Sequence, residues 1–97
     1  MDMIFPQVLQ AVPAKGYAVY AYMNDGTIRL FNAAALIERG GVFAPLGDME
    51  VFRAALTVLN DTIAWDLSGK RDPADCIDID PFTVRDSPAV AEWEMTA

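Results

Sequence analysis

The sequence predicts an α+β domain: an antiparallel β-sheet of about five strands, formed by two hairpins and an N-terminal strand, with two short helices packed on one face. Residues 17–23 and 27–32, rich in aromatic and β-branched side chains, flank an Asp-Gly pair. Two further apolar runs flank Asn60-Asp61, and the segments between the hairpins carry helix-capping signals. With 97 residues, of which 54% are hydrophobic and 22% charged, the chain matches one folded domain. We place this domain at residues 6–80 and treat residues 81–97 as a C-terminal tail.

The first three strands follow in chain order. Residues 7–14 alternate loosely and end at Pro13, which predicts an edge strand, because proline lacks the donor that a central strand needs. Lys15-Gly16 predicts a turn, and Tyr17–Met23 gives the clearest strand signal in the chain. The hairpin closes through Asp25-Gly26 into residues 27–32.

The loop length of this hairpin decides which side chains face the core. A two-residue loop pairs Met23 with Ile28 and Ala21 with Leu30. A three-residue loop pairs Ala21 with Arg29 instead and places an arginine among core residues. We therefore predict the two-residue loop. The inward row that it predicts is Val19, Ala21, Met23, Ile28 and Leu30.

The same register predicts an aromatic outer face. Tyr20, Tyr22 and Phe31 share it, and Arg29 can lie against a tyrosine ring. Two interpretations stay open: the first strand, a loop or the C-terminal tail covers these rings, or they form an exposed patch for self-association, a partner or a flat ligand.

Short helices and a second hairpin complete the domain. Asn32 can cap a helix over 33–39 that Gly40-Gly41 ends, and Asp48 can cap a helix over 49–54. Between the two helices, Phe43 and Leu46 are expected to pack into the core. The second hairpin runs over 56–59 and 62–65 and ends at Trp65, which is either a core anchor or a stacking surface for a ligand.

The domain ends with a polar stretch, and the tail that follows it carries a further helix signal. Asp72-Pro73 predicts a short turn that runs into Cys76-Ile77. Ser87-Pro88 is a good helix start, so we expect a short docked helix with Val90 and Trp93 on one side.

The order of these segments resembles a known family, the bacterial domain-of-unknown-function family 2442. The resemblance implies an α+β fold, a bacterial cytoplasmic setting and a partner in toxin–antitoxin-like pairs, with some members described as ligand-binding. Asn32, Met23 and Cys76-Ile77 stand where the family usually has aspartate, phenylalanine and Leu-Tyr. The matching segments are 6–13, 17–26, 28–32, 41–46, Asp48 with Phe52, 63–65 and 72–77.

Composition excludes several classes of function. The chain has no histidine and one cysteine, Cys76, so it can form neither an imidazole-dependent triad nor an internal disulfide. Fourteen acidic against seven basic residues give a net charge of −7, which argues against nucleic-acid binding. No signal peptide or membrane-spanning run is recognisable, so we expect a cytoplasmic protein without membrane contact.

The negative charge is concentrated in the last third. Residues 61–97 hold nine acids and three bases, net −6, whereas residues 1–60 hold five acids and four bases, net −1. The spacing does not match a calcium-binding loop, so we predict no metal site and no cofactor, and leave open whether the cluster ever binds a cation. The cluster consists of Asp72, Asp75, Asp78 and Asp80.

These observations predict a non-enzymatic, acidic protein-interaction or regulatory module, and the resemblance to family 2442 implies that it is the antitoxin-like partner of another small protein. Its partner is expected to present a basic surface, and pairing into a homodimer is compatible with the same features. The alternative is a small-molecule-binding domain that uses the aromatic sheet face. The candidate interaction residues are Tyr20, Tyr22, Arg29, Phe31 and Trp93, and the candidate stacking residue is Trp65.

Overall fold

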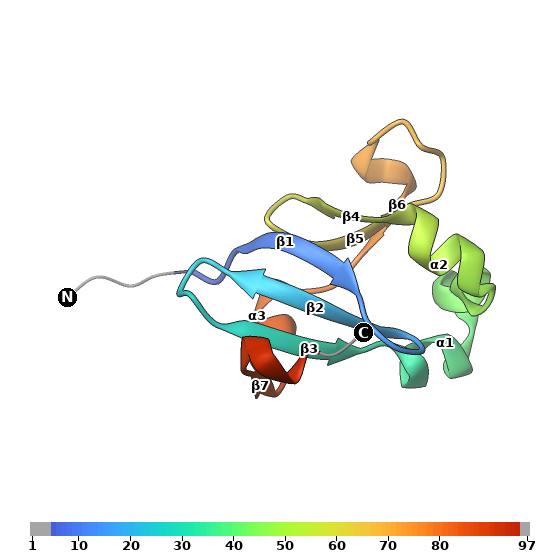
Figure 1. Ribbon diagram of the computed structural model, residues 1–97. Helices are drawn as coiled ribbons and strands as arrows, with labels where there is room; N and C mark the ends of the chain where they lie inside the picture. The colour runs from blue at the N-terminus through green and yellow to red at the C-terminus, as the bar shows by residue number, and fades with distance from the viewer. Residues whose placement is uncertain (1–4, 96–97) are drawn as a thin grey trace.

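The computed structural model describes residues 5–95 as an α+β fold with two antiparallel sheets (Figure 1). Sheet A has the strand order β1-β2-β3-β7 and sheet B the order β4-β5-β6. The strands are β1 (Val8–Pro13), β2 (Ala18–Met23), β3 (Ile28–Asn32), β4 (Leu56–Leu59), β5 (Thr62–Asp66), β6 (Cys76–Asp78) and β7 (Ala89–Val90). The helices are α1 (Ala34–Arg39), α2 (Met49–Ala55) and α3 (Pro81–Arg85), with 3₁₀ turns η1 (Gly41–Gly47), η2 (Pro73–Asp75) and η3 (Glu92–Glu94).

The α+β class is confirmed, but the prediction of one sheet of about five strands is wrong. The two hairpins form separate sheets that share one core, and β6 and β7 add a strand to each. The hairpins meet where the Val8 amide donates to the Asp61 carbonyl oxygen at 2.8 Å. Helices α1 and α2 lie together at one end of the sheets, on the right of Figure 1, and not across one face.

The predicted register of the first hairpin is also wrong. Tyr22 pairs with Ile28 and Ala21 with Arg29, because the turn contains three residues, Asn24 to Gly26. The Met23 amide donates to the Thr27 carbonyl oxygen at 2.9 Å, and Gly26 adopts a φ of +85°.

Local hydrogen bonds explain this longer turn. Asp25 Oδ1 accepts from the Thr27 amide at 2.9 Å and from the Thr27 hydroxyl at 2.6 Å. The arginine that this register turns inward does not enter the core. Arg29 is half-buried at the end of the sheet, where its guanidinium donates to the Ser87 carbonyl oxygen at 3.2 Å.

The second hairpin and the cap of α2 agree with the predictions, whereas the N-cap of α1 is Ala33 and not Asn32, whose Oδ1 accepts from the Ala34 amide at 2.9 Å. Leu59 pairs with Thr62 across Asn60-Asp61, whose φ angles of 53° and 66° are those of a left-handed two-residue turn. Asp48 caps α2 by accepting from the Glu50 amide at 3.0 Å.

The predicted tail helix from Ser87 is absent from the described residues. The helix of this region is α3, which Asp80 caps by accepting from the Phe82 amide at 2.9 Å, with a proline at its first position. The segment after Ser87 instead covers the open edge of β3. Val90 pairs with Ile28, and the Leu30 amide donates to the Pro88 carbonyl oxygen at 2.9 Å.

A chain of three aromatic rings joins the two sheets to the helical end. The Phe52 ring of α2 lies 5.3 Å from the Trp65 ring of β5 and 5.4 Å from the Tyr17 ring, which precedes β2. The Tyr17 hydroxyl donates to the Gly47 carbonyl oxygen at the end of η1, at 2.5 Å. Around this chain, the fully buried large side chains are Trp65, Phe52, Leu46, Ile63, Val8, Val19 and Val84.

The observed turn predicts a penalty for a side chain at Gly26. A left-handed backbone costs an L-residue about 1–2 kcal/mol, so Gly26→Ala should lower the free energy of unfolding by about that amount in urea denaturation. Gly47→Ala is the matched control. A Cβ there meets only Ile37 Cγ2, at 3.7 Å, so its cost should stay below about 0.5 kcal/mol. Equal losses in both variants would contradict the three-residue turn.

Candidate functional site

The register correction divides the predicted aromatic surface. Tyr20 and Tyr22 lie half-buried on the outer face of sheet A, where Ile28 and Leu30 are their cross-strand neighbours. Phe31 pairs with Val19, and its side chain is 6% exposed within the core. Arg29 also lies on the inward side. Phe31 and Arg29 therefore do not belong to this outer face.

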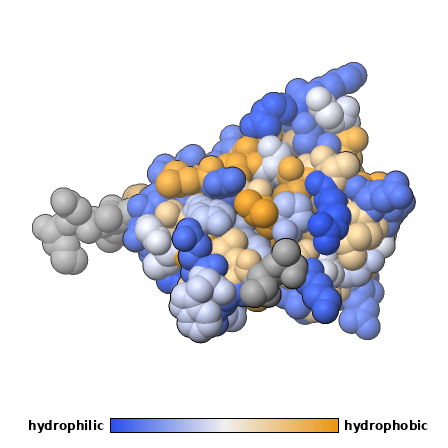
Figure 2. All heavy atoms as spheres, in the orientation of Figure 1, coloured by the Kyte–Doolittle hydropathy of each residue, from blue (hydrophilic) through white to orange (hydrophobic). Residues whose placement is uncertain are grey.

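The C-terminal segment covers part of the outer face. The Tyr22 hydroxyl lies 3.6 Å from Met95 Sδ, and β7 extends sheet A beside Ile28. Trp93, in η3, is 82% exposed. Figure 2 shows this side of the molecule as a mixture of apolar and polar residues, with hydrophilic side chains around its rim. The sequence left open whether the tyrosine rings are covered by another segment or form an exposed patch. For Tyr22, the C-terminal tail covers the ring.

Trp65 is a core residue. It is fully buried, it packs against the Phe52 ring, and its Nε1 has no hydrogen-bond partner among residues 5–95. A ligand arriving from solvent therefore cannot stack on the Trp65 ring. The prediction of a ligand-stacking surface at this position is wrong, and the core-anchor interpretation is confirmed.

The four clustered aspartates have different roles. Asp72 and Asp80 cap η2 and α3 through the amides of Ala74, at 3.0 Å, and Phe82. The side chains of Asp75 and Asp78 make no hydrogen bond or ion pair with any residue in the described range 5–95, and both are exposed. Within that range no group of three or more ligating side chains could hold a metal ion.

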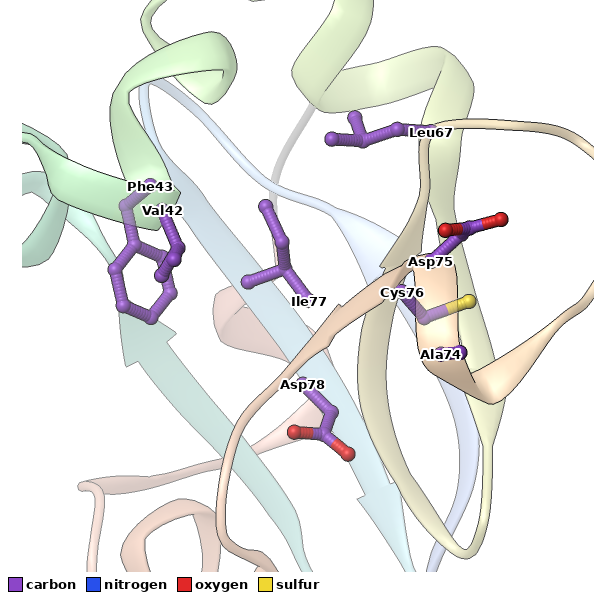
Figure 3. A pocket seen from close by; sticks show the side chains of 8 residues that line it. All are labelled: Val42, Phe43, Leu67, Ala74, Asp75, Cys76, Ile77 and Asp78. Carbon is purple, nitrogen blue, oxygen red and sulfur yellow. The ribbon is translucent and has the colours of Figure 1, made fainter.

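The two unpartnered carboxylates line a pocket of about 420 Å³ between η1 and β6, which we call the β6 pocket (Figure 3). Apolar side chains approach it from separate parts of the chain: Val42 and Phe43 from η1, Leu67 after β5 and Ile77 from β6. Val42 and Leu67 are 70% and 42% exposed, respectively. The complete lining is Val42, Phe43, Leu67, Ala74, Asp75, Cys76, Ile77 and Asp78.

A second hollow adjoins the β6 pocket. Its volume is about 280 Å³, and Leu67 lines both hollows. The C-terminal half of α2 supplies its other apolar wall through Val51, Ala54 and Ala55. The two hollows together provide an apolar surface on either side of one exposed leucine. No basic side chain lines either of them.

The loop that follows β5 is shaped around Asp66. Its carboxylate accepts from the amides of Gly69, at 3.0 Å, and Arg71, at 2.7 Å. Desolvation opposes ionisation, but these hydrogen bonds outweigh it and lower the pKa of Asp66. Arg71 is directed back across sheet B, where its guanidinium donates to Thr57 Oγ1 and to the Val58 carbonyl oxygen. The positive charge of Arg71 therefore lies over β4 and not in the β6 pocket.

Cys76 lies half-buried in the wall of the β6 pocket. Desolvation and the negative charge of Asp66 raise the pKa of its thiol above the usual 9.0. The neutral thiol is a poor nucleophile, and the chain contains no histidine that could remove its proton. Cys76 is therefore poorly suited to act as a nucleophile.

The aspartate cluster can be recognised in the sequence, but the pocket cannot. Val42 and Ile77 are far apart in the sequence, and no periodicity links a 3₁₀ turn to a three-residue strand. The available signal was the pair of exposed apolar residues, Val42 and Leu67, each in a loop-like stretch. Within the described residues, no helix has the length and apolar character required to cross a membrane.

The two tryptophans should respond differently to truncation. Trp65→Ala empties the centre of the core and should cost about 3–5 kcal/mol of unfolding free energy, whereas Trp93→Ala should stay within about 0.5 kcal/mol. Urea denaturation measures both. In Trp93→Phe, the remaining Trp65 fluorescence should resist acrylamide quenching. Strong quenching in that variant would contradict the burial of Trp65.

The thiol environment predicts slow alkylation of Cys76. With iodoacetamide, the folded chain should react with a pH midpoint above that of the urea-unfolded chain, and Asp66→Asn should lower that midpoint. Because folding favours the neutral thiol, this group's contribution to stability is full below the usual pKa of 9.0. It is lost as the pH rises through the folded pKa. Equal midpoints for the folded and unfolded chains would contradict this environment.

No family model, curated protein or solved structure matches this chain. The resemblance to family 2442 therefore remains a prediction from the order of its motifs.

Proposed function

We propose that this protein is a non-enzymatic interaction module that binds a positively charged, apolar-rich segment of another protein in the β6 pocket. The observation that carries the proposal is the lining of that pocket. Apolar side chains from η1 and β6 line it together with Asp75 and Asp78, the two aspartates of the cluster that have no structural role in the described residues.

The apolar lining supports a macromolecular ligand. Side chains as exposed as Val42 and Leu67 gain from being covered, at about 25 cal/mol for each Å² of apolar surface removed from water. The adjoining hollow along α2 extends the apolar surface past Leu67. A partner segment with two or more apolar side chains fits this surface.

The charges support a basic partner. The chain carries a net charge of −7, and its acidic excess lies in the part of the sequence that contains β6. Such a field accelerates association with a cationic partner and disfavours an anionic one. An antitoxin-like role, in which the acidic protein covers part of a basic partner, is the biological form of this proposal.

The alternative, a small-molecule-binding domain on the aromatic sheet face, has less support. Trp65 is inaccessible, and the C-terminal segment lies against Tyr22. Of the two tyrosines on this face, that leaves the half-buried ring of Tyr20. We therefore assign the binding role to the β6 pocket.

A direct test uses a fluorescein-labelled octapeptide of alternating lysine and valine, with anisotropy as the readout. The double variant Asp75→Asn/Asp78→Asn should bind it about two- to thirtyfold more weakly, as expected for the loss of two exposed charge pairs worth about 0.2–1 kcal/mol each. Val42→Ser should also weaken binding, because it removes an apolar contact at an exposed position.

The matched control is Glu38→Gln/Glu92→Gln, which makes the same change in net charge at two exposed positions outside the pocket. This variant should bind the peptide within about twofold of the unaltered protein. If the wild-type chain does not bind the peptide, or if both double variants lose affinity equally, the β6 pocket is not the binding site.

A further inference from the structure

Strand β6 has one paired edge and one open edge. It is the last strand of sheet B, and its partner β5 lies on one side only. The Ile79 amide donates to the Ile63 carbonyl oxygen at 3.1 Å, which fixes the alternation of the ladder. Ile77, two residues earlier and opposite Trp65, therefore directs its backbone groups toward β5. The backbone amides and carbonyls of Cys76 and Asp78 are directed to the open edge.

Several other strand edges of the described fold are engaged, and on β4 the Arg71 guanidinium donates to the Val58 carbonyl oxygen. The C-terminal segment pairs with β3, and β1 is linked to the β4–β5 turn through the Val8 amide. The hydrogen bonds of residues 5–95 include none that reaches the open side of Cys76 or Asp78. Unpaired strand edges attract other strands, and β6 leaves two residues available for such pairing.

The side chains of β6 alternate between two environments. Ile77 shares the inward side with Trp65 and points toward Phe43 and Val42 across the β6 pocket (Figure 3). Asp78 faces the opposite side of sheet B, next to its cross-strand neighbour Ala64. A strand placed along the open edge would continue this alternation, with one side chain in the pocket and its neighbours beside the carboxylates.

We propose that the partner segment binds as an additional β-strand along the open edge of β6. This proposal rests on the proposed function and specifies how the partner is bound. Its residue opposite Ile77 is apolar and enters the β6 pocket. The residues on either side of it are basic, and they exchange backbone hydrogen bonds with Cys76 and Asp78. The recognised element is a basic–apolar–basic triplet in extended conformation.

The charges of β6 oppose a second copy of this chain as the occupant. Two β6 edges paired about Ile77 would bring the Asp75 and Asp78 carboxylates of both copies close together. The pocket lining contains no basic residue that could neutralise them. Like charges placed across an interface are costly, and charged edge residues are a common protection against self-pairing. A cationic strand removes this repulsion, and an identical acidic strand increases it.

Backbone methylation of the alternating lysine–valine octapeptide tests the binding mode. In an antiparallel arrangement the lysine amides bond to Cys76 and Asp78, and the valine amides point away from β6. N-methylation of the two central lysines should therefore weaken binding about tenfold or more, because two hydrogen bonds are lost. N-methylation of the two central valines should change it by less than about threefold.

The outcomes separate the binding mode from the binding site. If methylation weakens binding only at the lysines or only at the valines, strand addition is supported. An effect confined to the valines indicates a parallel strand. Equal effects of both sets, in a peptide whose binding still depends on Asp75 and Asp78, would overturn strand addition and leave the proposed function standing. No binding of the unmethylated peptide would overturn both.

Amide hydrogen exchange of the protein provides a second readout that needs no variant. In the presence of the unmethylated octapeptide, the amides of Cys76 and Asp78 should become protected, and that of Ile77, which is already paired with β5, should change little. Protection that fails to include Cys76 and Asp78 would contradict the proposed mode.

Discussion

The contact between the rings of Phe52 and Trp65 sets the arrangement on which the rest of the structure depends. Trp65 has Leu56 and Ile77 as its cross-strand neighbours, so its position fixes both edges of sheet B. Phe52 carries the contact into α2 and on to Tyr17, whose hydroxyl holds the end of η1. The two walls of the β6 pocket, η1 and β6, are thus positioned by one chain of aromatic contacts. The binding surface is a consequence of how the core is closed.

Much of the fold follows from local signals in the sequence. The inward row of β2, the Asn60-Asp61 turn and the Asp48 cap each depend on residues close together in the chain, and the structure shows all three. The first hairpin shows where such reasoning fails. The side chain of Asp25 stabilises a three-residue turn, and an arginine at a sheet end reaches a carbonyl oxygen, so it does not have to be buried.

The shortest elements and the pocket could not be predicted, for a related reason. Strands β6 and β7 contain three and two residues, too few for a period-two pattern to stand out. Their positions depend on open edges provided by distant strands. The cluster from Asp72 to Asp80 was visible in the sequence, but the division between capping and unpartnered carboxylates appears only when the backbone amides are in place.

The pairing of β7 with β3 has a consequence for the protein during its synthesis. Every other strand of the fold precedes β7 in the chain, so the edge of β3 and the side chain of Ile28 lack their cover until Val90 has been made. A nascent chain with a completed β1–β2–β3 sheet presents an unpaired apolar edge to its surroundings. The vulnerable stage for aggregation is therefore late translation, when most of the core is available and this one strand is still missing.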